Sequence, residues 1–266
     1  MARKPKGKDL AKRKGTAPTT YDYGAQSGVG AEDITRDDFL VPFIRIIQTN
    51  SPQVAKKNEK YIEGAEAGMF FNTVTNQLYA GDPGFMFHLS AKVRAYAEFT
   101  PRDDGGGFVG QREPDDPDVV KLIKDQGRFG RLSTEAGTEL VETYYAYGVI
   151  VTGVEGDEPQ PVVLPLSSTG ITPFKQFLSA LNPLLRKGVP IFAARIRVSA
   201  RYASNKEGDY YRWHLVFDGG TTTEYLAAPD DPIILVGAEF RESIATGLTR
   251  VDYSASQEDT PDPDAF

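Results

Sequence analysis

Residues 85–99 alternate apolar and polar side chains over fifteen positions, and this run constrains the fold more than any other feature of the chain. The odd positions are apolar throughout, whereas the even positions include Lys92, Arg94 and Tyr96. A period of two is typical of a strand with one buried face and one wet face. The run therefore predicts a long strand whose wet face presents these three side chains.

Shorter β-rich runs and amphipathic segments fill most of the remaining chain. We expect strands at 43–48, 139–152, 162–166, 190–203 and 209–217, and a hairpin over 69–79. Helical spacing or capping residues predict helices at 119–126, from Ser168 or Thr169 to about Arg186, and from Asp230 to Gly247. The glycine-rich and acidic stretch 101–118 reads as a mobile loop. This order predicts a mainly β protein with minor α content, an elaborated antiparallel barrel of the oligonucleotide-binding type (OB-fold) with an inserted helix and a C-terminal helix.

Charge divides the chain into three parts. The first fourteen residues hold seven basic side chains and one acid, although the whole chain has a net charge of -7. We expect a disordered basic arm over 1–30, one OB-like domain over 31–253 and a disordered acidic tail over 254–266. A basic arm is either a nucleic-acid contact or simply a solvated terminus. Because the remainder is acidic, any contact with nucleic acid needs a localised basic face.

The tail carries four carboxylates, no basic residue and a terminal aromatic ring, and its charged or aromatic members are Glu258, Asp259, Asp262, Asp264 and Phe266. Such a peptide cannot bury enough apolar surface to fold alone. Its charge and terminal ring suit a partner with a basic groove. The alternative is a tail that only keeps the chain soluble.

Basic and aromatic side chains recur on the expected wet faces of three strands. Besides Lys92, Arg94 and Tyr96, these faces carry Arg195, Arg197, Arg201, Tyr210 and Arg212. Cations that follow phosphates and rings that stack on unpaired bases are what single-stranded nucleic acid requires. The alternative is ordinary solvation, since antiparallel strands commonly expose Lys and Arg.

The loop predicted at 101–118 supplies two further candidates, Arg102 and Phe108. A flexible loop that presents a cation and a ring could close over a bound strand. The same loop could equally be a plain connector, since its three consecutive glycines lack the Lys and Ser or Thr of a phosphate-binding loop.

Several classes of function find no support in the sequence. The chain has no cysteine and only two histidines, without metal-ligand spacing, so we expect no metal, no cofactor and no disulfide. Nucleophile-elbow, kinase and Walker motifs are absent, which argues against an enzyme. No apolar run approaches the roughly 18 residues that a membrane span requires. We therefore expect a protein that does not associate with membranes. The absence of cysteine suits the reducing environment of the cytoplasm.

Five segments resemble a family of single-stranded DNA-binding proteins from tailed bacteriophages. They are DDFLVPFIRIIQTNSPQ (37–53), GMFFNTVT (68–75), FTPRDDGGGFVG (99–110), ELVETY (139–144) and the acidic tail that ends in Phe. The resemblance implies an OB-fold that coats single-stranded DNA during phage replication and recombination, in the cytoplasm of the infected host. The tail would recruit replication proteins such as a polymerase or helicase–primase.

Two other classes of function remain open from the sequence. A virion or assembly protein is the main alternative, because β-rich phage chains with disordered arms also build capsids and tails. A protein that neutralises a host enzyme by mimicking nucleic acid is the other. The sequence leaves open whether the chain forms a homo-oligomer.

Overall fold

The computed structural model of the chain describes residues 33, 38–101, 104, 106–127, 130–151, 158–206, 208–219, 224–249, 251 and 253. The chain divides into two units, residues 1–38 and residues 39–266, and every strand and helix named below belongs to the second unit. The predicted arm at 1–30 and the predicted tail at 254–266 lie outside the described residues.

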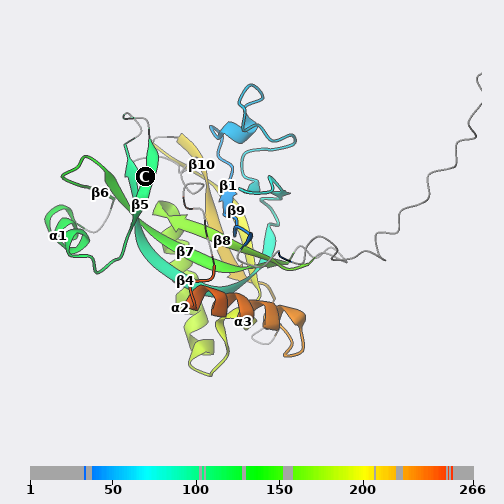
Figure 1. Ribbon diagram of the computed structural model, residues 1–266. Coiled ribbons are helices and arrows are strands. Elements are labelled where there is room, and N and C mark those ends of the chain that lie inside the picture. Colours follow the sequence, from blue (N-terminus) through cyan, green and yellow to red (C-terminus); the bar gives the residue numbers. More distant parts are fainter. Residues whose placement is uncertain are drawn as a thin grey trace, which may run out of the picture. The chain divides into compact units, whose positions relative to one another are not determined.

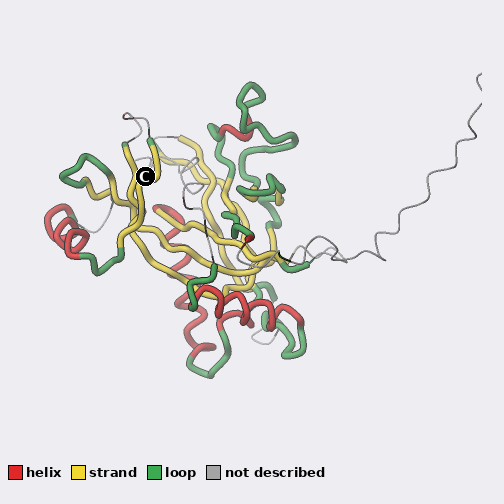
Figure 2. The backbone as a smooth tube through the Cα atoms, in the orientation of Figure 1, coloured by secondary structure: helices red, strands yellow, loops and turns green. Residues whose placement is uncertain are grey.

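Ten strands and three α-helices make up the described part of the second unit (Figures 1 and 2). The strands are β1 (Ile44–Ile46), β2 (Phe70–Asn72), β3 (Leu78–Tyr79), β4 (Phe85–Thr100), β5 (Gly107–Arg112), β6 (Arg131–Ser133), β7 (Glu139–Val151), β8 (Gln160–Ser167), β9 (Ile196–Asn205) and β10 (Gly208–Phe217). The helices are α1 (Pro117–Gln126), α2 (Ile171–Leu185) and α3 (Pro232–Ala245). Short 3-10 turns are η3 (Pro52–Val54), η5 (Ser168–Gly170) and η6 (Ile191–Ala193).

The strands form two antiparallel sheets. The larger sheet has seven strands in the order β10-β9-β4-β7-β6, with β5 paired to β4 and β8 paired to β7. The long strands β4 and β7 run side by side through its centre (Figure 1). The smaller sheet has the order β1-β2-β3. The mainly β class predicted from the sequence is confirmed, but these described strands do not close into the predicted barrel.

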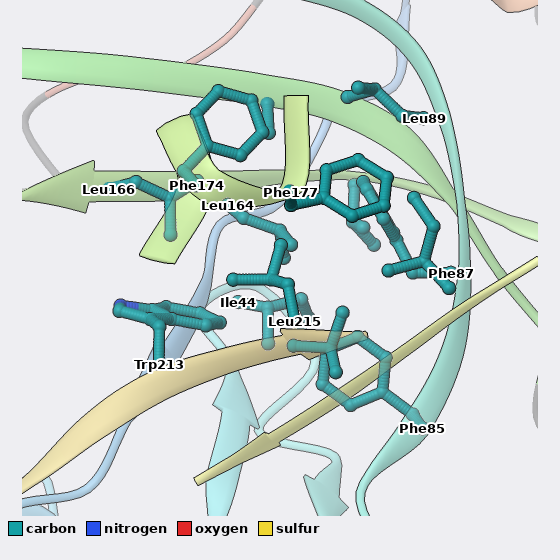
Figure 3. Close-up of a cluster of buried hydrophobic side chains, with 14 of the residues drawn as sticks. Ile44, Phe85, Phe87, Leu89, Leu164, Leu166, Phe174, Phe177, Trp213 and Leu215 are labelled. Atoms are coloured by element: carbon teal, nitrogen blue, oxygen red, sulfur yellow. The ribbon is translucent and has the colours of Figure 1, made fainter. Parts of the chain in front are cut away.

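The large sheet is covered on both faces. Its inner face packs against α2 and the small sheet, in a cluster that includes Phe87, Phe174 and Trp213 (Figure 3). Its outer face packs against α3, whose Ile233 and Phe240 contact the tyrosines of β7. Because both faces carry apolar cover over β4 and β7, the predicted one-sided wet strand does not occur there.

The three predicted helices are present, with ends that differ by a few residues from the predicted ones. α3 begins as predicted, since the Asp231 carboxylate accepts a hydrogen bond from the Ile233 N–H at 3.0 Å. α1 has the same kind of cap at Asp116. α2 begins at Ile171 after the turn η5, with Gly170 at its N-cap, so the predicted start at a capping Ser168 or Thr169 is wrong. At the end of α2, Leu184 is buried while Leu185 is exposed.

The prediction of a mobile loop over 101–118 is wrong in part, because β5 and the start of α1 lie within it. Residues 107–112 pair with the end of β4 and so extend the sheet. Among the described residues, no helix is both long enough and apolar enough to cross a membrane.

Candidate nucleic-acid interface

A β-bulge in β4 divides the basic surface that the sequence predicted. Leu89 lies opposite Gly148 and Ala91 lies opposite Tyr147, so Ser90 is an extra residue in the ladder. Because strand side chains alternate, one extra residue moves all later side chains to the opposite face. Lys92 and the rest of the predicted wet face of β4 therefore lie on the inner side of the sheet.

The two other predicted residues of β4 are engaged within the protein. The Arg94 guanidinium forms an ion pair with Glu142 at 2.7 Å and donates to the Tyr96 hydroxyl at 3.3 Å. Tyr96 is only 1% exposed and packs in a small cluster beside α1. The expectation that Tyr96 faces solvent is wrong, and of these three residues only Lys92 is exposed.

Phe108 is also held within the fold. It lies in β5 opposite Phe99, with ring centroids 5.9 Å apart, and stacks on Tyr253 at 6.1 Å. Tyr253 reaches further into this aromatic cluster, where its hydroxyl lies 2.6 Å from that of Tyr147. The expectation of a mobile loop that presents Phe108 is therefore wrong. Arg102 lies outside the described residues.

The hairpin of β9 and β10 keeps its predicted residues on one surface. Arg201 lies directly opposite Arg212, and Ser199 lies opposite His214. Arg197 shares their face by the alternation of β9, and Arg195 continues the row, since its carbonyl accepts the Asp218 N–H at 2.8 Å. We call the outward surface formed by the following residues the basic face: Arg195, Arg197, Arg201, Tyr210, Arg212 and His214.

The basic face belongs to the outer side of the sheet. β4 pairs with β9 through Met86 and Arg197, and Met86 precedes the bulge. Arg197 therefore lies on the side that α3 covers further along, whereas Lys92 and Arg94 lie on the other. The sequence predicted that these cations share one surface. In the structure they lie on opposite sides of the large sheet.

The arginines of the basic face differ in their partners. Arg197 makes two hydrogen bonds of 3.1 Å to the two carboxylate oxygens of Asp218, so its charge is balanced. Arg201 and Arg212 are exposed, and neither has an ion pair with any residue that the structure describes. Burial, followed by these two positive charges, lowers the pKa of His214. Among the described residues, the outer part of the basic face is therefore a positive site with no ion-pair partner.

The end of the hairpin extends beyond the body of the sheet. β4 pairs with β9 only at Ile196, Arg197 and Val198, and the N–H of Ala200 bonds to the carbonyl of Gly81 at 2.9 Å. From there on, β9 and β10 pair with each other as a two-stranded segment, residues 201–205 and 208–212, which we call the ribbon. Arg201, Tyr210 and Arg212 all lie on it.

The ribbon is anchored on its β10 side by residues near β1. The Gln48 side-chain amide donates to the Tyr211 carbonyl and accepts from the Tyr211 N–H, both at 2.8 Å. Gly68 lies against the Tyr211 ring, where an added Cβ would be 2.6 Å from Cε1. These contacts hold the ribbon at a defined position relative to the core.

Tyr202 also lies on the ribbon, and its side chain is 60% exposed. Its ring meets that of Tyr211 edge to face, with centroids 5.8 Å apart. The two rings occupy the face of the ribbon opposite Arg201 and Arg212. Alternation within β9 predicts the side of the strand on which Tyr202 lies. It does not predict that β9 continues past the end of its pairing with β4, where this side is exposed.

Comparison with known proteins identifies the family. The sequence matches the family described as Pam3 phage gp34-like protein over residues 11–247, which is most of the chain. The chain belongs to the Pam3 phage gp34-like family. The match therefore confirms a phage protein family, while binding of single-stranded DNA stays a prediction. For this Pam3 phage gp34-like chain, neither the curated proteins nor the solved structures gave a match.

Proposed function

We propose that this protein is a non-enzymatic, sequence-independent single-stranded DNA-binding protein of phage replication and recombination, and that it holds DNA on the basic face. The observation that carries the proposal is the pair of exposed guanidinium groups of Arg201 and Arg212, which lie opposite each other on the ribbon and form no ion pair with any described residue. Like charges directly opposite each other destabilise a strand pair. A bound phosphate removes that repulsion.

The arrangement of the basic face suits an extended polyanion. Arg195 to Arg201 span about 20 Å along β9 at about 3.3 Å per residue, long enough to follow several phosphates. Three arginines without a described ion-pair partner, Arg195, Arg201 and Arg212, predict a salt slope of about -2 for a single strand, from about 0.7 per phosphate. Affinity should then fall roughly twentyfold between 50 and 200 mM salt.

The acidic character of the remaining surface also favours this narrow site. With a net charge of -7, the chain repels DNA at most positions, so binding concentrates where positive charge is uncompensated. The proposal does not require a closed OB barrel, because the projecting ribbon can present the cations from an open sheet. The acidic tail, ending at Phe266, would contact replication proteins such as a polymerase or helicase–primase.

The proposal is tested by fluorescence anisotropy with a labelled thymidine oligonucleotide of about thirty nucleotides and a duplex of equal length. We expect salt-sensitive binding of the single strand and much weaker binding of the duplex. Absence of binding at low salt, both with residues 254–266 and without them, would refute the proposal. Large assemblies in sedimentation without DNA, together with that absence, would favour the virion-protein alternative.

A further inference from the structure

The face of the ribbon opposite the arginines carries an aromatic pair to which the proposed function assigns no role. Tyr202 and Tyr211 are directly opposite each other in the β9–β10 register. Tyr211 is half-buried, whereas Tyr202 is 60% exposed. Because most of the Tyr202 side chain is exposed, packing in the core does not account for an aromatic ring at this position.

We propose that Tyr202 is a base-stacking platform, so that a single strand crosses the ribbon with phosphates on its arginine face and a nucleobase on its tyrosine face. This inference rests on the proposed function and adds to it a residue that would make the protein prefer single-stranded DNA to duplex DNA. A ring can stack only on a base that is free of its pairing partner, and stacking tolerates any base because every base has a π-face.

The structure holds the Tyr202 ring in place from two sides. One edge meets Tyr211, which is itself fixed by Gln48 and by the close approach of Gly68. The Tyr202 hydroxyl hydrogen-bonds to Asp209 on the same face of the ribbon, and this bond lowers the pKa of the Asp209 carboxyl. A ring held in this way loses little side-chain freedom when a base stacks on it.

Asp209 also helps to determine which part of the DNA lies on each face of the ribbon. Its carboxylate is negative at neutral pH and stands beside the exposed ring, so it repels a phosphate from the tyrosine face. Arg201 and Arg212 attract phosphate on the other face. The charges therefore orient a strand that crosses the ribbon, with phosphates toward the arginines and a base toward Tyr202.

The test compares Tyr202→Ala and Tyr202→Phe with the unchanged protein on two probes. The probes are the thirty-nucleotide thymidine strand and an abasic strand of the same length, which keeps the phosphates but has no bases. We expect Tyr202→Ala to weaken binding of the thymidine strand by about 5- to 150-fold, with the salt slope and the abasic affinity unchanged. Tyr202→Phe keeps the ring and should bind within a fewfold of the unchanged protein.

Other results separate this inference from the proposed function. Equal loss on both probes, or no loss on the thymidine strand, would overturn the stacking role while leaving binding at the arginines intact. Failure of the unchanged protein to bind either probe at low salt would overturn both. Because Tyr202 is exposed, we expect Tyr202→Ala to fold, and its circular dichroism spectrum provides the control.

Discussion

Replacing both Arg201 and Arg212 with alanine should make the protein more stable while it binds DNA less well. The two guanidinium groups face each other across the ribbon, and removing a like-charged cross-strand pair should raise the free energy of unfolding by roughly 0.2–1 kcal/mol. Two of the three arginines without a described ion pair are lost, so the salt slope should drop from about -2 to about -0.7. Binding would then weaken only about threefold, instead of roughly twentyfold, between 50 and 200 mM salt.

Two assays on the same samples measure this prediction. Anisotropy over a salt series gives the slope, and urea unfolding followed through the single tryptophan, the buried Trp213, gives the stability. Arg186→Ala/Lys187→Ala is the matched control, because it removes two exposed cations just after α2 and should leave the slope unchanged. A double variant of the ribbon that keeps a slope near -2, or that loses more than about 1 kcal/mol of stability, would refute the reasoning.

Three further predictions follow from other contacts. Gly68→Ala should lower stability and displace Tyr211, because Gly68 has a φ of +90° and its added Cβ would clash with that ring; an unchanged urea midpoint would contradict this. Hydrogen bonds from Arg112 to both carboxylate oxygens of Glu98 lower the pKa of this carboxyl. The stabilisation from this pair is therefore present above the ordinary value of 4.5 and is lost as pH falls through the lower folded value. Glu98→Gln should therefore flatten the acid limb of a stability–pH curve, and an equally steep limb would count against the pairing. Deleting residues 254–266 should tighten DNA binding at low salt, as measured by anisotropy, and no change would make the tail a solubilising segment only.

Alternation in the sequence predicted the two faces of β9 and β10 correctly from Ile196 onward, but the predicted start at 190 is wrong because residues 191–193 form the turn η6. The side chains of Arg197, Arg201 and Arg212 reach the same face, as a period of two requires. The same reasoning failed in β4 although its pattern is longer. Phe87 and Leu89 are buried on the inner face, and Ala95, after the bulge at Ser90, is buried under α3 on the outer face.

The bulge in β4 was hidden because the sheet has apolar cover on both sides. The odd-numbered residues of β4 are apolar both before and after the bulge, although they lie on different faces. The sequence therefore shows one continuous alternation and gives no sign of the bulge. The position of Tyr202 was hidden for a different reason. Exposure there depends on where β4 stops pairing with β9, and that is a property of a neighbouring strand rather than of the local sequence.

Ultraviolet crosslinking of the full chain to the thymidine strand, with the crosslinked peptides identified by mass spectrometry, tests the central claim most directly. We predict crosslinks within residues 196–217, lost at high salt and reduced in the variant lacking Arg201 and Arg212. Crosslinks confined to other elements, such as the inner-face segment around Lys92, would contradict the assignment of DNA to the β9–β10 hairpin.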